Sequence, residues 1–415
     1  MKPGSFRLRR IDLTWVRFAL HNALRNRRRS LVTVSIAALG TAAILLAGGF
    51  AYATYEGLAQ ASARSTGHLI VGKPGHFSSD EEVPLQYGID QAAQLQTRLL
   101  GDPAVRYVLP RVDFSGLISN GDKSTIMLAM GIDPDTEFAV KGPFLTVKEG
   151  AILESNAKEA EVVLGDALAR SLKAKTGSSL TLMASTTDGA LNALDVIVKG
   201  VVSTGIPDMD KRLVYTDIKT AQKLLNTQRV SSLGVFLNSM DATGSARQRL
   251  ASMLPEMTVQ SWVEQAFFYR SVRDLYNRIF GALGVIISVI VVFVVANAMA
   301  MAIIERTREI GSLRAMGTLP GQLIRSFSFE GMFLGGASAI AGALLALAVA
   351  LLLIVFPVQM PPPPGRSTGY PLMVTIDAAL YVGTIIMMVV LSMLSSAWIA
   401  HRTMRQTIVD ALAHI

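Results

Sequence analysis

Long apolar runs separated by polar sequence divide this chain into membrane-like and water-like regions. Four of the runs cover residues 31–51, 279–304, 327–356 and 376–400. An α-helix rises about 1.5 Å per residue and the hydrocarbon core is about 30 Å thick, so a spanning helix needs roughly 20 apolar residues. The pattern therefore predicts four transmembrane helices. The last three runs exceed that length, so these helices tilt or continue beyond the bilayer.

Basic residues predict the side of the membrane on which each polar region lies. Asp12 is the one acidic residue before the first apolar run, whereas nine residues there are basic: Lys2, Arg7, Arg9, Arg10, Arg17, Arg25, Arg27, Arg28 and Arg29. Short loops rich in Lys and Arg remain cytoplasmic. Residues 1–30 are thus predicted to be a cytoplasmic segment, and four crossings return the tail, 401–415, to the same side. The gap at 305–326, with four arginines, also falls there.

The basic start followed by an apolar run also fits a secretory signal peptide. The apolar core of such a peptide is usually 7–15 residues long, and the run at 31–51 is longer. We therefore favour an uncleaved first helix.

Residues 52–270 form one large polar excursion, predicted to be an α+β domain outside the membrane. EVVLGDALARSLKAKTGSSLTLMAS reads as a strand, a helix from Asp166, a turn at Gly177 and a second strand. LDVIVKGVVSTGI reads as a strand pair with a bend or bulge at Gly200, and TDIKTAQKLLN as a helix capped by Thr216 or Asp217. Acidic residues slightly outnumber basic ones here, so the net charge of +8 belongs to the cytoplasmic flanks.

Two connections of this domain are predicted from local pattern. SWVEQAFFYRSVRDLYNRIF has apolar residues mostly at helical spacings, and the segment from Phe50 to Ser65 lacks proline, so both are expected to be helical and continuous with the membrane helices. They are interpreted as stalks that carry movement to the domain; the alternative is that they are ordinary helix ends. The loop at 357–375 contains four consecutive prolines, which favour a stiff polyproline segment.

Several kinds of chemistry find no support in the sequence. The chain has no cysteine, which excludes disulfides and thiol catalysis. It has no GxxxxGK[ST] phosphate loop and no GxSxG motif, and its five histidines form no metal-binding pattern, so catalytic and metal-site residues are predicted to be absent. No basic stripe with interleaved aromatic residues suggests nucleic-acid binding.

The short gap ERTREIGSLRAMGT mixes acidic and basic residues beside an apolar stripe. Ile310, Leu313 and Met316 recur at three-residue spacing, which predicts a short amphipathic helix that ends near Gly317. Membrane anchoring needs only basic residues, and an anionic leaflet would repel Glu305 and Glu309. The mixture instead favours docking to a protein partner, with an apolar centre and a charged rim.

This gap, followed by Ile324, Phe327, Glu330 and several glycines, resembles the signature of FtsX-like (MacB-type) ABC transporter permeases. VVLGDALARSLKAKTGSSLTL with DVIVKGVV resembles the MacB periplasmic core domain, and RTMRQTIVDAL resembles the usual C-terminus. The overall layout is nearest to lipoprotein-releasing, Lol-type permeases.

The resemblance implies a permease that pairs with a second copy or a paralogue and works in the bacterial inner membrane. It implies a dimer of cytoplasmic ATPase subunits as partner, with ATP and Mg²⁺ bound there and no cofactor on this chain. Its ATP-driven movement would act on a lipoprotein, lipid, peptide or drug, with a periplasmic adaptor as a further possible partner. The alternative is an FtsX-like scaffold that activates periplasmic cell-wall hydrolases without transport. Residues expected to contact the ATPase are Glu305, Arg306, Arg308, Glu309, Ile310, Leu313 and Arg314.

Polar and small residues within the membrane runs predict helix contacts. Glu330 is expected to make a polar contact in a dimer or with the second span, where Asn297 is the candidate; the alternative is a helix N-terminal acid favoured by the dipole. Gly331 and Gly335 have GxxxG spacing, which allows close helix packing.

Overall fold

The structure is a computed structural model, and it describes residues 27–77, 84–141, 145–155, 157, 159–362 and 369–404. The chain divides into a helical unit (Met1–Tyr55, Arg273–Val358 and Pro371–Ile415) and a sheet-containing unit (Glu56–Val272 and Gln359–Tyr370). Most of the predicted N-terminal segment and tail, residues 1–26 and 405–415, lies outside the described residues.

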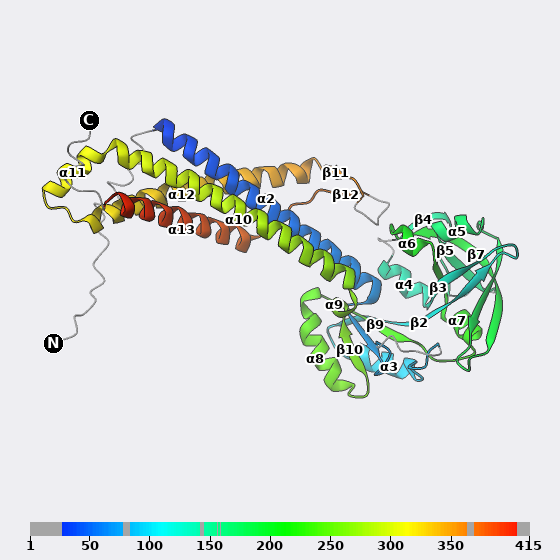
Figure 1. Cartoon of the computed structure of the whole chain (residues 1–415). Coiled ribbons are helices and arrows are strands. Elements are labelled where there is room, and N and C mark those ends of the chain that lie inside the picture. Colours follow the sequence, from blue (N-terminus) through cyan, green and yellow to red (C-terminus); the bar gives the residue numbers. More distant parts are fainter. Residues whose placement is uncertain are drawn as a thin grey trace. The chain divides into compact units, whose positions relative to one another are not determined.

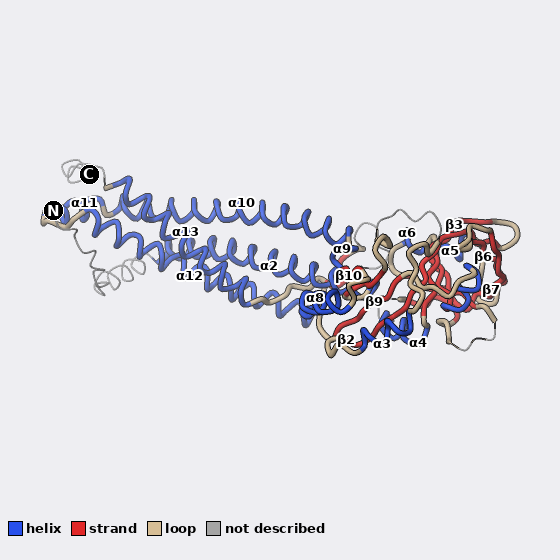
Figure 2. The backbone as a smooth tube through the Cα atoms, turned by 90° about the horizontal axis from the view of Figure 1, so that it is seen from below, coloured by secondary structure: helices blue, strands red, loops and turns tan. Residues whose placement is uncertain are grey.

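Within the described residues, four helices are long and apolar enough to cross a membrane: α2 (Arg27–Thr66), α10 (Phe267–Glu305), α12 (Pro320–Val355) and α13 (Ala378–Thr403). Their membrane-spanning parts lie side by side in both views (Figures 1 and 2). Each predicted apolar run lies within one of them, apart from one or two residues at the ends. Helix α12 begins at Pro320, so residues 320–326, assigned to the gap from sequence, belong to the third long helix.

Close contacts between small residues hold the helical unit together. A Cβ atom on Gly342 of α12 would lie 2.5 Å from the carbonyl oxygen of Ala38 in α2, and one on Gly40 would lie 2.8 Å from Val291 in α10. Glycine at these points lets the backbones approach closely. The outward faces of the same helices carry exposed Leu, Ile, Val and Phe side chains, as lipid-facing surfaces do.

Helix α11 (Thr307–Ala315) connects α10 to α12 at one end of the bundle (Figure 1). Between α12 and α13, the structure has two short strands, β11 (Gln359–Met360) and β12 (Tyr370–Pro371). The proline run predicted to be stiff begins at Pro361, and residues 363–368 of this loop lie outside the described residues.

The sheet-containing unit follows α2 and returns to α10. Its strands are β1 (Leu69–Gly72), β2 (Val105–Ser119), β3 (Ser124–Ile132), β4 (Thr146–Gly150), β5 (Glu161–Gly165), β6 (Ser179–Ser185), β7 (Leu191–Ser203), β8 (Leu213–Asp217), β9 (Ser232–Leu237) and β10 (Thr258–Ser261). Its helices are α3 (Ala92–Leu100), α4 (Pro134–Lys141), α5 (Asp166–Ser171), α6 (Pro207–Asp210), α7 (Ile218–Leu225), α8 (Thr243–Met253) and α9 (Trp262–Gln265).

The strand order is β10-β1-β9-β2-β3-β8-β5-β7-β4, with β6 beside β2 and β7. Antiparallel pairs dominate, and β3–β8 and β5–β7 are parallel. Strands and helices are therefore mixed without a repeated βαβ unit, which confirms the predicted α+β class.

Strand β2 belongs to both halves of this sheet. Residues Val105–Arg111 pair with β9, and residues Val112–Ser119 pair with β3. We call β10, β1, β9 and 105–111, with α3 and α8, the first lobe. The second lobe consists of 112–119, β3 to β8 and α4 to α7.

Two local predictions for the second lobe are confirmed: the order of elements from β5 to β6, and the cap of α7. β5, α5, a left-handed turn at Gly177 and β6 follow the predicted order. The Asp217 side chain caps α7 by accepting a hydrogen bond from the backbone N–H of Thr220. The predicted strand pair at 194–206 is wrong: β7 is one strand, and its register with β5 shifts by one residue at Gly200 because a β-bulge absorbs the bend.

The second stalk is also interrupted, contrary to the predicted continuous helix. Helix α9 ends at Gln265 and α10 starts at Phe267, with Ala266 between them in a non-helical conformation. A capping box of Ser261 and Glu264 starts the short α9. The break accompanies the burial of Trp262, whose ring meets that of Tyr269 edge-to-face at 4.9 Å.

Candidate functional site

The connection between α10 and α12 is a helix held at both ends by local hydrogen bonds. The Thr307 hydroxyl donates to the carbonyls of Ile303 and Ile304, at 3.1 and 2.9 Å, which joins α11 to the last turn of α10. After α11, Gly317 has a φ of +97°, a conformation that favours glycine. The turn at Gly317 leads directly into α12, whose first residue is Pro320. Proline is favoured at the first position of a helix.

Helix α11 is amphipathic, but its apolar face packs on the bundle. Ile310 is buried in a cluster that also contains Leu323 and Phe327 of α12, and Leu313 packs against the same cluster. Ile310 is thus buried and Leu313 half-buried against the bundle, and their expected contact with the ATPase stays a prediction. These two residues hold α11 in place.

The outward side of the connection carries charges and a separate apolar tip. Glu305, Arg308 and Glu309 are exposed, and Arg314 is half-buried. Met316 and Leu319 are 76% and 62% exposed. Sequence periodicity placed Met316 on the stripe with Ile310, but α11 ends at Ala315, so Met316 leaves the helical repeat. Leu319 was missed, because it belongs to no periodic segment.

Arg306 is also covered rather than presented to solvent. Its Nη1 lies 3.6 Å from Oε2 of Glu330, and the two side chains are 11% and 3% exposed. The expected partner of Glu330, Asn297, is instead exposed on α10. Glu330 lies near the α11 end of α12, so a residue of the connection reaches it.

Gly331 and Gly335 lie where α12 contacts α13. A Cβ atom on Gly331 would lie 1.9 Å from Oγ of Ser396, and one on Gly335 would lie 2.5 Å from Ser392. Both distances are too short for any side chain, so these positions permit the close packing of the two helices.

No cluster of three or more His, Asp or Glu residues that could hold a metal ion occurs in the part of the chain that the structure describes. The α10–α12 connection offers instead a surface of mixed charge with the exposed side chains of Met316 and Leu319 at one end. Such a surface suits binding to another protein.

Comparison with protein families covers both units. Residues 30–253 match the MacB-like periplasmic core domain, and residues 281–408 match the FtsX-like permease C-terminal family. The chain is an FtsX-like permease with a MacB-like periplasmic core domain. The second match includes α11, α12, α13 and the part of α10 from residue 281 onward.

Relatives of this permease include lipoprotein-releasing system transmembrane proteins. It is 27% identical to LolE of Haemophilus influenzae over 271 residues, covering 63% of this chain and 64% of that protein. It is 25% identical to LolC of Neisseria meningitidis over 245 residues, covering 56% and 58%. The permease thus spans less than two thirds of the length of these curated relatives.

The periplasmic region of MacB from Actinobacillus actinomycetemcomitans is also similar, with 19% identity and a TM-score of 0.36, covering 49% of this chain and 94% of that one.

Proposed function

We propose that this permease transmits the ATP-driven movement of a separate cytoplasmic ATPase to its periplasmic domain, and that the movement releases a lipoprotein from the membrane. The observation that carries the proposal is the form of α11. Its apolar face is packed on the membrane helices, and its outward side presents Arg308, Glu309 and the Met316–Leu319 tip.

A contact made at this surface reaches two long helices directly. Helix α11 starts two residues after α10 ends, and Ile310 packs against residues of α12. The Arg306–Glu330 ion pair makes a second link to α12. A force on α11 is therefore received by both helices, because packed side chains transmit displacement with little compression.

The basic flanks support an orientation in which α11 and both chain ends lie in the cytoplasm. The ATPase dimer then docks from that side and holds ATP and Mg²⁺, since this sequence contains no phosphate loop. The lipoprotein substrate is inferred from the relatives named for lipoprotein release.

A second copy of the permease, or a paralogue, completes the assembly. Asn297 is exposed on α10, and Phe293 and Met301, one turn before and after it, are 71% and 49% exposed. A polar amide is costly in contact with lipid but favourable where helices meet. We therefore propose this face of α10 as the contact between permeases.

Co-purification tests the docking surface. The double substitution Arg308→Glu and Arg314→Glu is expected to abolish retention of the ATPase on the affinity-tagged permease. Arg402→Glu is the matched control, because Arg402 is an exposed arginine of α13. Undiminished retention by the double variant would overturn the docking assignment.

Release of a fluorescent lipoprotein from proteoliposomes then separates transport from an FtsX-like signalling role. The permease–ATPase complex should release it with ATP and not without. A complex that hydrolyses ATP and binds through α11, yet releases no lipoprotein, would favour the signalling role.

A further inference from the structure

Arg111 lies at the point where β2 passes from the first lobe to the second. It is the last β2 residue paired with β9, opposite Ser232, and Val112 begins the pairing with β3, opposite Gly131. A side chain at this position can therefore reach groups of both lobes.

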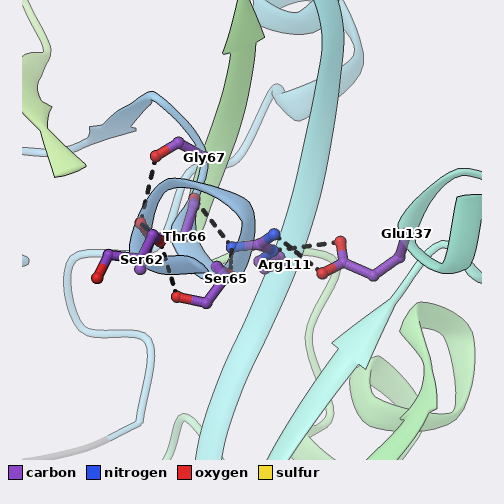
Figure 3. Close-up of polar contacts among 6 residues, drawn as sticks. All are labelled: Ser62, Ser65, Thr66, Gly67, Arg111 and Glu137. Atoms are coloured by element: carbon purple, nitrogen blue, oxygen red, sulfur yellow. Dashed lines mark hydrogen bonds and ion pairs between the residues drawn. The ribbon is translucent and has the colours of Figure 1, made fainter. Parts of the chain in front are cut away.

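The guanidinium of Arg111 joins the end of α2 to the second lobe (Figure 3). Its Nη1 donates to the carbonyl oxygens of Ser65 and Thr66, both at 2.9 Å. Its Nε and Nη2 donate to the two carboxylate oxygens of Glu137, at 3.3 and 2.9 Å. One planar group thus satisfies two carbonyls of the last helical turn and a carboxylate at once.

Burial makes this arrangement specific. Arg111 is 4% exposed and Glu137 is fully buried. A charge removed from water is tolerated only when its partners are well placed, so loss of either residue removes a compensating charge from the other. Lysine could not replace Arg111, because an ammonium group lacks the fork that meets a carboxylate with two parallel bonds. The positive charge also complements the carbonyl end of α2.

Glu137 is held firmly by the second lobe. It lies in α4, which follows β3 directly, and the next residue, Phe138, packs in a core cluster with Tyr215 of β8. The Phe138 and Tyr215 rings meet edge-to-face at 6.2 Å. The carboxylate therefore moves with the second lobe.

The end of α2 is seated equally closely on the first lobe. Gly67 has a φ of +102°, and a Cβ atom there would lie 3.0 Å from the backbone nitrogen of Val235 in β9. The chain continues from this turn into β1. The first lobe is thus joined to α2 directly by the backbone, whereas the second lobe is joined to the first through strand β2 and to α2 through the Arg111 side chain.

We propose that Arg111 is a positioning residue that makes the second lobe follow α2. Displacement of the last turn of α2 is passed through the guanidinium to Glu137 and α4. The structural link stands on the geometry alone, and its use in ATP-driven movement rests on the proposed function.

Distance measurements between spin labels test the link in the full chain in lipid nanodiscs. The absence of cysteine allows two labelled pairs without further changes. Gln60→Cys with Asp122→Cys reports on α2 against the β2–β3 turn of the second lobe. Gln60→Cys with Gln248→Cys reports on α2 against α8 of the first lobe. All three positions are exposed.

Arg111→Met and Glu137→Gln should each broaden the distance distribution of the first pair about twofold, since local contacts limit local movement. Neither should broaden the second pair. Glu137→Gln is the sharper variant, because it keeps the Arg111 bonds to α2 and weakens only the bond to the second lobe. Arg249→Met, which removes an exposed partner of Asp102 within the first lobe, should change neither pair.

An unchanged first pair in both variants would overturn the inference, and so would equal broadening of both pairs, which indicates general loosening. Addition of the ATPase and ATP to the unsubstituted chain tests the proposed function separately. If ATP does not change the distance distribution of the unsubstituted chain, the result counts against ATP-driven movement. The role of Arg111 is then decided by comparing the variants with the unsubstituted chain in the absence of nucleotide.

Discussion

Arg306 and Glu330 form an ion pair that joins the α10–α12 connection to the third long helix, with 3.6 Å between Nη1 and Oε2. Both side chains are largely buried. The pair lies beside the core that holds Ile310, so charge and packing together fix α11 on the bundle.

Removal of one partner of this pair should be more damaging than removal of both. Arg306→Met removes the cation that lies 3.6 Å from the buried Glu330 carboxylate, and we expect a loss of about 3–5 kcal/mol in the free energy of unfolding. The double variant Arg306→Met with Glu330→Met should recover most of that loss. Unfolding of the purified chain in mixed micelles measures both. A double variant no more stable than the single one would show that the pair is not the source of the effect.

The contact between α12 and α13 predicts a difference between glycines. Gly331→Ala should destabilise the chain by about 1–3 kcal/mol, because the new methyl group overlaps Ser396. Gly383→Ala is the matched control in α13, where a Cβ atom has nothing within 4 Å. It should be neutral or stabilising by up to about 1 kcal/mol through helix propensity. Thermal unfolding in detergent compares the two, and equal losses would contradict the packing geometry.

His68 is expected to make the stability of the periplasmic domain depend on pH. Burial, and secondly the charge of Arg64, lower the pKa of its imidazole below the ordinary value of about 6.5. Its Nδ1 accepts a hydrogen bond from the backbone N–H of Leu237 at 3.1 Å, which protonation would remove. The unfolded chain therefore binds the proton first, and stability falls as pH decreases below about 6.5.

Denaturant unfolding between pH 8 and pH 5 measures this dependence. His68→Asn should flatten the curve, because the amide oxygen accepts the same hydrogen bond without titrating. The other histidines remain in both proteins, so the difference between the curves isolates His68. Parallel curves would assign the pH dependence elsewhere.

The exposed apolar tip should contribute to ATPase binding. Met316→Ser with Leu319→Ser is expected to raise the Kd by about tenfold or more, since an exposed apolar side chain that becomes buried at an interface contributes about 1–2 kcal/mol. Met253→Ser, at an exposed methionine of α8, is the control. Titration of the ATPase onto immobilised permease provides the measurement, and an unaltered Kd would restrict the interface to the charged residues.

The exposed position of Asn297 predicts contact between two permeases. Asn297→Cys should form a disulfide-linked dimer in oxidised membranes. Leu344→Cys is the control, because Leu344 is exposed on a different long helix, α12. Non-reducing electrophoresis distinguishes them, and dimers formed equally by both variants would indicate random collision.

Much of the fold follows from local chemistry in the sequence. Apolar run length predicts the four long helices, and Asp217 marks the start of α7 because its carboxylate caps the helix. Where three-dimensional packing decides, periodicity alone is insufficient. Periodicity does not predict that Ile310 packs on the bundle while Met316 is exposed. It also does not predict that Ala266 interrupts the helix of the second stalk.

Long-range pairing was the least accessible part of the site. Glu330 was predicted to need a polar partner, but the sequence offers several, and chain connectivity selects Arg306 over Asn297. The Arg111–Glu137 link gives no sequence signal at all, since it depends on where β2 crosses between lobes.

Strand β1 pairs with β9 on one side and with β10 on the other, so that Leu69 lies opposite both Val235 and Ser261. The first segment of the domain to be synthesised thus completes its sheet only with the last. During export, the backbone groups of β1 remain unpaired on the β10 side until nearly all of residues 52–270 have crossed the bilayer. Chains truncated before Ser261 should for this reason be degraded rather than accumulate with a partly folded periplasmic domain.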